Sequence, residues 1–239
     1  TDIWLYSVAT GKLLPLAGPD KPYGRVFNDG FYGRIVFSPD GTKLAFVADD
    51  GVDPRPPEEV RNDVPVVRPD QGEGYTGYGP AQLYMAYLDP KPERCAAGRV
   101  QRLIRDDVWY GDPQWTPDGR TLVVHGNRSN ERESVRYSIN RNFDLYAIDI
   151  STGKQRQLTS GVGPEVSPRF SPDGKSLACL SVPRRGSHRD VFNLAIVTDL
   201  EKDKPAFRVL FDHHKAKGEP PHDAPAFPLP ADCWDGESH

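Results

Sequence analysis

The stretch FSPDGTKLAF at residues 37–46 occurs twice more, as WTPDGRTLVV at residues 115–124 and as FSPDGKSLAC at residues 170–179. Each copy has an aromatic residue, a small hydroxyl residue, Pro-Asp-Gly and an alternating apolar run. Proline presets the backbone for the first central position of a tight turn, aspartate bonds its own backbone, and glycine accepts a positive φ. The aromatic residue and the apolar run therefore predict two strands joined as a hairpin.

The repeat also predicts which of its side chains are structural. We expect the aromatic residue of each copy to be a core residue that anchors the hairpin; these are Phe37, Trp115 and Phe170. We expect the aspartate of each copy to serve the turn and not catalysis; these are Asp40, Asp118 and Asp173.

A second hairpin alternates with the first. The stretch DIWLYSVATGK at residues 2–12 is matched by DLYAIDISTGK at residues 144–154, with looser copies at residues 82–89 and 193–199. Two hairpins make a four-stranded unit, and a unit that repeats at roughly 40–50 residues is typical of a β-propeller blade. The sequence therefore predicts an all-β fold, a β-propeller of four-stranded antiparallel blades, with almost no helix.

The spacing of the copies predicts one propeller fragment over residues 1–239. Residues 1–17 predict half a blade, residues 31–103 a blade with an irregular insertion at 50–79, and residues 110–160 and 165–211 two further blades. Residues 225–239 predict the start of another blade. Because a closed propeller needs about 4–8 blades, we expect an incomplete ring of three full blades plus a partial first and last one. An incomplete ring leaves open strand edges, through which two copies can form a dimer.

Composition excludes some classes of partner. The net charge of −4 offers no basic field for a nucleic acid, and no run of about 18 apolar residues predicts a membrane span. Three cysteines at Cys95, Cys179 and Cys233 match no zinc spacing. We expect Cys179 and Cys233 to be small buried apolar residues, which leaves the compartment open between a bacterial cytoplasm and periplasm.

The repeated SPDGK and DLY-x-ID-x-x-TGK units resemble the propeller repeats shared by TolB and the prolyl oligopeptidase family. Residues 68–75 (RPDQGEGY), followed by QLY at 82–84, are similar to a long hairpin of acylaminoacyl-peptidase-like members. Residues 228–234 (PLPADCW) resemble the segment in which a Cys-Trp pair opens a late blade of those enzymes. The resemblance implies a propeller that caps an α/β-hydrolase domain and admits only peptides to a Ser-Asp-His triad.

The chain itself supplies no catalytic residue. The nucleophile elbow Gly-x-Ser-x-Gly is absent from the 239 residues. A Glu-Glu pair of the dipeptidyl-peptidase type is not assigned either, because Glu58 and Glu59 lie next to prolines in an expected loop. We therefore expect the isolated chain to hydrolyse no peptide.

Residues 60–79 of the insertion at 50–79 are the first candidate for contact with a substrate or partner. Tyrosine and arginine on a glycine-rich hairpin provide a large contact area with a polar tip, and long insertions in compact folds are often functional. The alternative is a solvent-exposed decoration that only packs against its blade. The candidate binding residues are Arg68, Asp70, Glu73, Tyr75 and Tyr78.

A second candidate lies in the charged excursion at residues 127–141. Arg136 and Arg141 are suited to hold a peptide carboxylate by paired hydrogen bonds, although Glu131 and Glu133 offer them internal partners. Histidines at 213, 214 and 222, with Asp223, invite a metal interpretation. Nothing in that Pro- and Lys-rich stretch fixes a ligand geometry, so we predict no metal site and no cofactor.

Two functions remain open at this stage. The first is a non-catalytic propeller that gates substrate access in a serine peptidase of the prolyl oligopeptidase family, with peptide substrates and an α/β-hydrolase domain of the same parent chain as partners. The second is a stand-alone TolB-like propeller that serves as a protein-binding platform. A lyase or glycosidase propeller is a weaker third option, because the regular repeat positions offer no set of carboxylates or histidines around the central channel.

Overall fold

The computed structural model describes residues 2–17, 20–30, 32–53, 56–62, 81–88, 99–106, 108–127, 143–161, 163–182 and 192–212. The elements within these ranges are β1 (Trp4–Tyr6), β2 (Leu13–Pro15), β3 (Val36–Phe37), β4 (Lys43–Ala48), α1 (Pro57–Asn62), β5 (Gln82–Tyr87), β6 (Val100–Arg102), β7 (Trp109–Trp115), β8 (Thr121–Asn127), β9 (Phe143–Asp149), β10 (Gln155–Gln157), β11 (Glu165–Phe170), β12 (Leu177–Ser181), β13 (Asn193–Thr198) and β14 (Ala206–Phe211).

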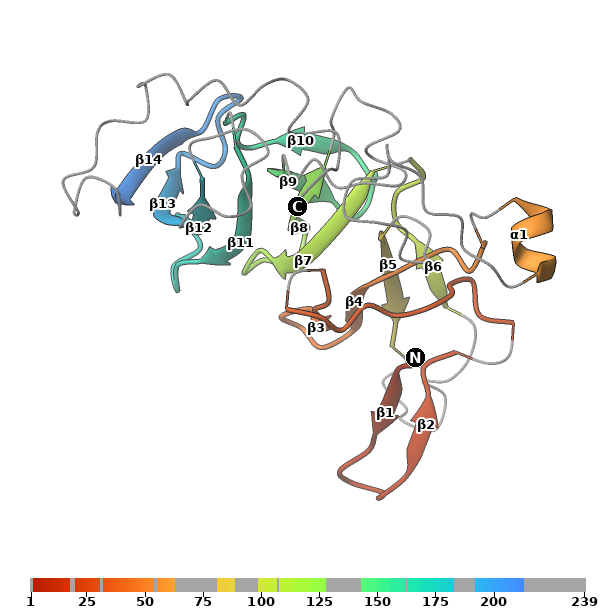
Figure 1. Cartoon of the computed structure of the whole chain (residues 1–239). Coiled ribbons are helices and arrows are strands. Elements are labelled where there is room, and N and C mark those ends of the chain that lie inside the picture. The colour runs from red at the N-terminus through yellow and green to blue at the C-terminus, as the bar shows by residue number, and fades with distance from the viewer. Residues whose placement is uncertain are drawn as a thin grey trace.

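The strands form three four-stranded antiparallel sheets and one two-stranded sheet. The sheets have the orders β3-β4-β5-β6, β7-β8-β9-β10 and β11-β12-β13-β14, and β1 pairs with β2. Figure 1 shows the three sheets spread like a fan, with the first strand of each nearest a common centre and the fourth farthest from it. This is the predicted β-propeller architecture, and we call the three sheets blade 1, blade 2 and blade 3 in chain order.

The Pro-Asp-Gly turns are built alike in all three blades. In the first, Gly41 N donates to Ser38 O over 2.8 Å, and Ser38 Oγ donates to Asp40 Oδ1 over 2.6 Å. The same pair of bonds recurs at Thr116–Gly119 and at Ser171–Gly174. Hydrogen bonds from the Thr116 hydroxyl and the Arg120 backbone N–H hold the pKa of the Asp118 carboxyl below its usual range. The carboxylates of these aspartates therefore stabilise the turns, as predicted.

The apolar core lies between the sheets. One cluster fills the space between blade 1 and blade 2 around Tyr110, Leu83 and Phe143, all of them fully buried. Another cluster joins blade 2 to blade 3 around Leu145 and Leu177. Burial between stacked sheets follows from alternation, because every second residue of a strand faces the neighbouring blade.

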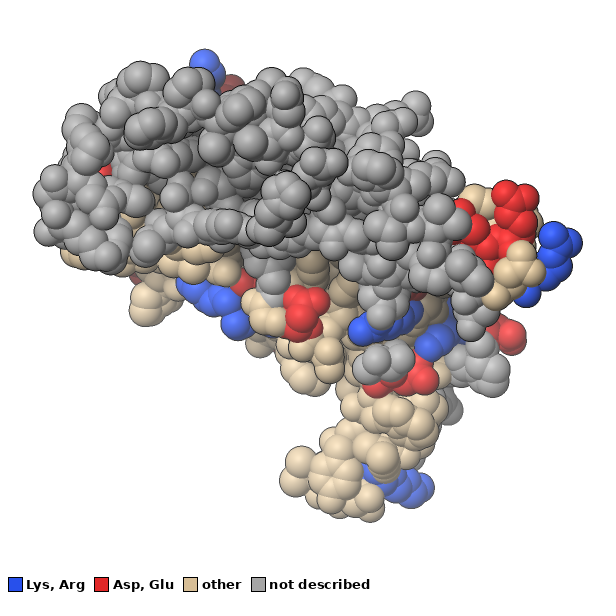
Figure 2. Space-filling model, viewed as in Figure 1, with Lys and Arg blue, Asp and Glu red and all other residues tan. Residues whose placement is uncertain are grey.

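A third cluster joins the β1–β2 hairpin to the free face of blade 1. Ile3 and Leu16 of the hairpin are buried against Phe46 and Tyr84, whose rings stack with centroids 5.7 Å apart. Burial raises the pKa of the Tyr84 hydroxyl to about 12. The opposite face of the hairpin is exposed and apolar, with Trp4, Tyr6 and Leu13 each more than half exposed, and Figure 2 shows this projection as a largely uncharged surface.

One expectation about the repeat aromatics is wrong. Trp115 and Phe170 are partly buried and pack against the preceding blade, and Trp115 Nε1 donates to Val36 O over 3.2 Å. Phe37 is 58% exposed. The aromatic of each hairpin packs on the inner strands of the blade before it, and within the described residues only the outer hairpin β1–β2 precedes blade 1. The position is therefore buried only where a whole blade lies in front of it.

The structure also corrects the local conformation of Glu58 and Glu59. Both lie in the first turn of α1, not in a loop, and no residue of that helix is buried. Pro57 suits this first helical position, because a helix leaves its first N–H groups unbonded in any case. Among the described residues, no helix has the length and apolarity needed to cross a membrane.

Two turn glycines offer a matched test of blade-to-blade packing. Gly41 and Gly174 have φ values of 68° and 70° in equivalent turns. A Cβ at Gly41 meets nothing within 4 Å, whereas one at Gly174 lies 2.6 Å from Pro117 Cγ in the turn of blade 2. We expect Gly41→Ala to lower the free energy of unfolding by about 1 kcal/mol through left-handed backbone strain alone. We expect Gly174→Ala to cost about 1 kcal/mol more through overpacking.

Urea unfolding followed by tryptophan fluorescence measures the difference between the two variants. Equal losses for Gly41→Ala and Gly174→Ala would mean that the turns of blade 2 and blade 3 do not constrain each other.

Candidate functional site

The predicted binding residues lie outside the described residues. Arg68, Asp70, Glu73, Tyr75 and Tyr78 belong to the connection between β4 and β5, and Arg136 and Arg141 to the connection between β8 and β9. Both connections join the second strand of a blade to its third, as does the connection between β12 and β13. The strand ends that these connections join are equivalent in the three blades, and they lie on one rim of the fan.

The structure brings together a charged cluster that the sequence did not indicate. Asp112 lies in the middle of β7 and its side chain is 4% exposed. Arg34, just before β3, places Nε 2.9 Å from Asp112 Oδ1, and Arg169 of β11 places Nη1 2.7 Å from Asp112 Oδ2. The Asp112 cluster, defined as Asp112, Arg34 and Arg169, thus joins the first strands of blade 2 and blade 3 to the segment that leads into the first strand of blade 1.

Backbone irregularities create this cluster. The register of β7 with β8 shifts between Gly111 and Gln114, and Asp112 has a φ of 47°. The register of β11 with β12 shifts in the same way before Arg169, where Ser167 has a φ of 55°. Both residues precede a proline, which favours an extended conformation. Such strained bulges re-aim side chains and are frequent next to functional sites.

A buried histidine lies behind the cluster. His125 of β8 is fully buried, and its ring meets that of Phe143 edge-on at 5.1 Å. A Cβ at Gly111 would lie 2.1 Å from His125 Nε2, so the imidazole occupies the space that the glycine leaves. Burial, with the nearby Arg169 cation, lowers the pKa of His125 to about 3, so the ring is neutral at physiological pH.

Two carboxyl groups meet at the junction of blade 2 and blade 3. Glu165 begins β11 and is 2% exposed, and its carboxylate accepts hydrogen bonds from Gly161 N at 3.2 Å and Ser181 Oγ at 3.3 Å. Burial, the charge of Asp144 and a hydrogen bond between the two carboxyls raise the pKa of Glu165 to about 8. Burial also raises the pKa of Asp144. The pair therefore retains a proton near neutral pH.

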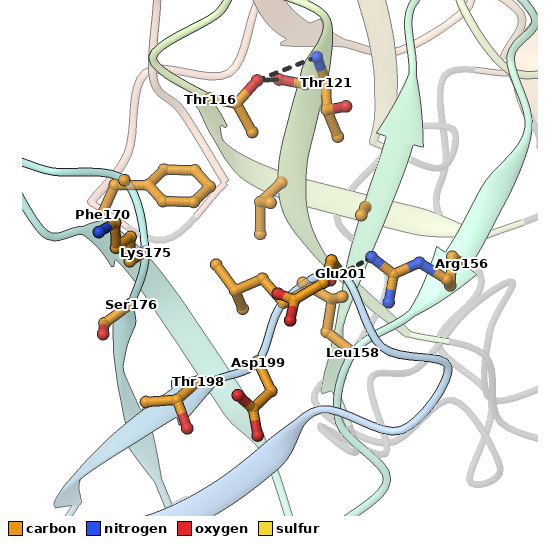
Figure 3. A pocket seen from close by; sticks show the side chains of 14 residues that line it. Thr116, Thr121, Arg156, Leu158, Phe170, Lys175, Ser176, Thr198, Asp199 and Glu201 are labelled. Carbon is orange, nitrogen blue, oxygen red and sulfur yellow. Dashed lines mark hydrogen bonds between the residues drawn. The ribbon is translucent and has the colours of Figure 1, made fainter.

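A wedge-shaped groove of about 630 Å³ separates the outer parts of blade 2 and blade 3. Figure 3 shows Phe170 on one wall and Arg156 on the other, with Glu201 between them. Arg156 Nη1 donates to Lys202 O over 2.8 Å, which ties β10 to the turn after β13. The lining combines the cations of Lys175 and Arg156 with carboxylates. It contains no histidine and no cysteine, and therefore no nucleophile paired with a histidine base.

Other chemistry is limited within the described part of the chain. No group of three or more His, Cys, Asp or Glu residues there is arranged to hold a metal ion. Cys179 is buried and free, as predicted for its strand position, and burial with the nearby Glu165 raises the pKa of its thiol to about 12. The histidine cluster around residues 213–223, together with Cys95 and Cys233, lies outside the described residues.

Sequence reasoning missed the polar groups on the inner strands. An Asp-Pro pair at Asp112 and a Ser-Pro pair at Ser167 stand at the same distance before the aromatic of their repeats. Proline inside a strand marks a bulge or an edge, so this spacing was the available signal. The three charged residues, Arg34, Asp112 and Arg169, are 57 or more residues apart in sequence. The repeat relates the strands that hold them, but it does not indicate which of their side chains pair.

Comparison with known proteins places these features in context. No family model matches the chain. The chain is 34% identical over 99 residues to dipeptidyl-peptidase 5 of Porphyromonas gingivalis, covering 40% of this chain and 14% of that protein. It is 26% identical over 203 residues to the acylamino-acid-releasing enzyme of Rattus norvegicus, covering 74% of this chain and 27% of that protein.

A third relative is a bacterial propeller protein. The chain is 29% identical over 118 residues to the Tol-Pal system protein TolB of Rickettsia bellii, covering 48% of this chain and 25% of that protein. The chain thus spans about a quarter or less of the length of these relatives. Together they confirm the predicted resemblance to prolyl oligopeptidase-family peptidases with TolB-like propeller repeats.

Removal of the central carboxylate is expected to destabilise the protein. Asp112→Ala leaves two guanidinium groups facing each other across a buried gap. Loss of one partner of a fully buried ion pair costs about 3–5 kcal/mol; the arginines are partly exposed, so we expect a loss of about 2 kcal/mol in the free energy of unfolding. Asp203→Ala, an exposed turn residue of blade 3, is the control and should change stability by less than about 0.5 kcal/mol. Equal urea midpoints for the two variants would contradict a bridging role for Asp112.

The carboxyl pair predicts a dependence of stability on pH. The Glu165–Asp144 pair of the folded protein holds a proton between pH 4.5 and about 8, a window in which the unfolded chain, with ordinary carboxyl pKa values, releases it. The free energy of unfolding therefore falls as the pH rises through this window. Glu165→Gln has no carboxyl group at this position to hold the proton. Over the same pH range we therefore expect the free energy of unfolding to fall less for Glu165→Gln than for the wild type, by a difference of about 1 kcal/mol or more.

Urea unfolding at pH values near both ends of the window measures this effect. Glu201→Gln, in an exposed turn, is the matched control and should follow the wild type. Parallel pH profiles for wild type and Glu165→Gln would show that the pair does not share a proton.

Proposed function

We propose that this chain is the propeller domain of a serine peptidase, in which it limits the access of substrates to a hydrolase domain of the same polypeptide. The observation that carries the proposal is the sequence similarity to two peptidases, one named for releasing dipeptides and one for releasing acylated amino acids. The four-stranded blades arranged around a common centre supply the architecture for such a filter.

A filter must keep its aperture, and the described contacts favour a stiff one. The apolar clusters between blades are non-directional and permit sliding. The Asp112 cluster adds directed bonds that join all three blades near their first strands. Arg156 adds a further bond between the outer parts of blade 2 and blade 3. These contacts oppose the separation of blades that would admit a folded protein.

The long connections on one rim are the proposed contact surface for substrate or for the hydrolase domain. Arg68, Asp70, Glu73, Tyr75 and Tyr78 on one connection, and Arg136 and Arg141 on the next, remain the residues we propose for it. Their types suit peptide recognition, because tyrosine offers an apolar ring with a polar tip and arginine pairs with carboxylates.

A second candidate is a protein-binding platform of the TolB type, without enzymatic activity. The 29% identity to the Tol-Pal system protein TolB over 118 residues favours it. In that case the same rim would bind a protein partner. Association of two copies through open strand edges stays a prediction for either candidate.

The test uses the intact protein and a fluorophosphonate probe for active serines. Three results together would support the filter. The probe labels the protein, the protein hydrolyses dipeptidyl or N-acyl-amino-acid nitroanilides, and it does not cleave folded proteins. Absence of both labelling and hydrolysis would reject the peptidase proposal and leave the binding platform.

Replacement of the rim aromatics is expected to weaken substrate binding. We expect Tyr75→Ala to raise KM about 3–10-fold with little change in kcat, since loss of a uniform binding contact affects KM alone. Tyr6→Ala removes an aromatic that is 64% exposed on the separate β1–β2 hairpin and is the control, with KM unchanged. If both variants behave alike in steady-state kinetics, residues 60–79 are not a substrate contact.

A further inference from the structure

Two arginines from different blades converge at the centre of the fan. Arg34 approaches from blade 1 and Arg169 from blade 3, and each binds a different oxygen of the one Asp112 carboxylate between them. The two guanidinium groups are therefore held by the same carboxylate, which belongs to a blade that lies between theirs in the chain.

Each guanidinium keeps hydrogen-bond donors that Asp112 does not use. Arginine has five N–H donors in a fixed plane. Arg34 uses Nε for Asp112, and Arg169 uses Nη1 for Asp112 and for Pro168 O. Within the described part of the chain, the remaining nitrogens of these two arginines have no acceptor. Their side chains are 48% and 39% exposed, so these donors face solvent.

The cluster carries an excess positive charge. One carboxylate faces two guanidinium groups, and in the described part of the chain no second acidic side chain lies within salt-bridge distance of either arginine. Asp112 itself is 4% exposed, so an incoming anion meets the cations and not the carboxylate. Paired guanidinium groups with free donors match the planar geometry of a carboxylate.

The backbone holds this arrangement in place before any ligand arrives. Asp112 and Ser167 adopt positive φ values immediately before prolines, a conformation that persists only where the surroundings enforce it. The bulges bring Asp112 of blade 2 and Arg169 of blade 3 to the same level of the fan. Preorganised donors lose little entropy when they bind.

We propose that Arg34 and Arg169 form a binding site for a carboxylate at the centre of the propeller, of the kind that ends a peptide chain. Asp112 is a positioning residue of this site, because it orients both guanidinium groups without facing the ligand. Inorganic phosphate shares the oxyanion chemistry, and the test separates the two. The proposal does not depend on a hydrolase domain, so the binding assay and the serine probe can fail independently.

The test is a ligand-observed NMR saturation-transfer titration of the intact protein. The probe is N-acetyl-trialanine, whose only charge is its C-terminal carboxylate, and its C-terminal amide is the matched neutral probe. We expect binding of the acid that is at least about tenfold tighter than that of the amide, as for one charged hydrogen-bonded pair. We also expect the binding to weaken as salt rises. Displacement of the acid by phosphate at lower concentration than by acetate would reassign the site to phosphate.

Variants assign the binding to the two arginines. Arg34→Gln leaves Asp112 paired with Arg169, so it preserves the fold, and it should weaken binding of the acid about fivefold or more. Arg34→Lys retains the charge but not the forked donors and should fall between wild type and Arg34→Gln. Arg208→Gln, on the exposed outer strand β14, is the control and should bind as wild type does. Equal binding of acid and amide, or equal affinity of Arg34→Gln and Arg208→Gln, would overturn the proposal.

Discussion

One buried carboxylate, Asp112, sets the relation of the three blades to one another. Apolar packing between stacked sheets is favourable in many relative positions, because it depends on area and not on direction. Hydrogen-bonded ion pairs depend on both distance and angle. The bonds from Arg34 at 2.9 Å and Arg169 at 2.7 Å therefore select one position of blade 1 and of blade 3 against blade 2. A charge with 4% exposure is tolerated only because both of its oxygens are paired.

The other polar contacts between blades follow the same logic with different chemistry. Glu165 and Asp144 join blade 2 to blade 3 as a pair that keeps a proton, because two charges in so dry a place are too costly. His125 stays neutral for the same reason and fills the space beside Gly111. Buried opposite charges meet at the centre of the fan, where two guanidinium groups face one carboxylate, and this is where an anion would be attracted.

Repetition explains both the regularity of the fold and its exceptions. The three Pro-Asp-Gly turns share their hydrogen bonds because each turn is satisfied by its own four residues. Burial of the repeat aromatic depends instead on the blade in front. Trp115 contacts Val36 of blade 1 and Phe170 packs against blade 2, whereas Phe37 belongs to the first blade and remains 58% exposed. The sequence repeat thus determines the hydrogen bonds within each turn, whereas the neighbouring blade determines whether the repeat aromatic is buried.

The sequence by itself determined the strands, their hairpin turns, the four-stranded blade and the resemblance to peptidase propellers. Those features depend on turn chemistry and on alternation over a few adjacent residues, which can be read along the chain. Only the tertiary structure decided that Arg34, Asp112 and Arg169 meet, that Glu165 faces Asp144, and that α1 replaces part of an expected loop. The partners in these pairs come from different blades, and a one-residue bulge beside a proline turns each inner-strand side chain to a new face. Pairing across blades therefore depends on the stacking of whole sheets, a property of three-dimensional packing that local sequence patterns do not encode.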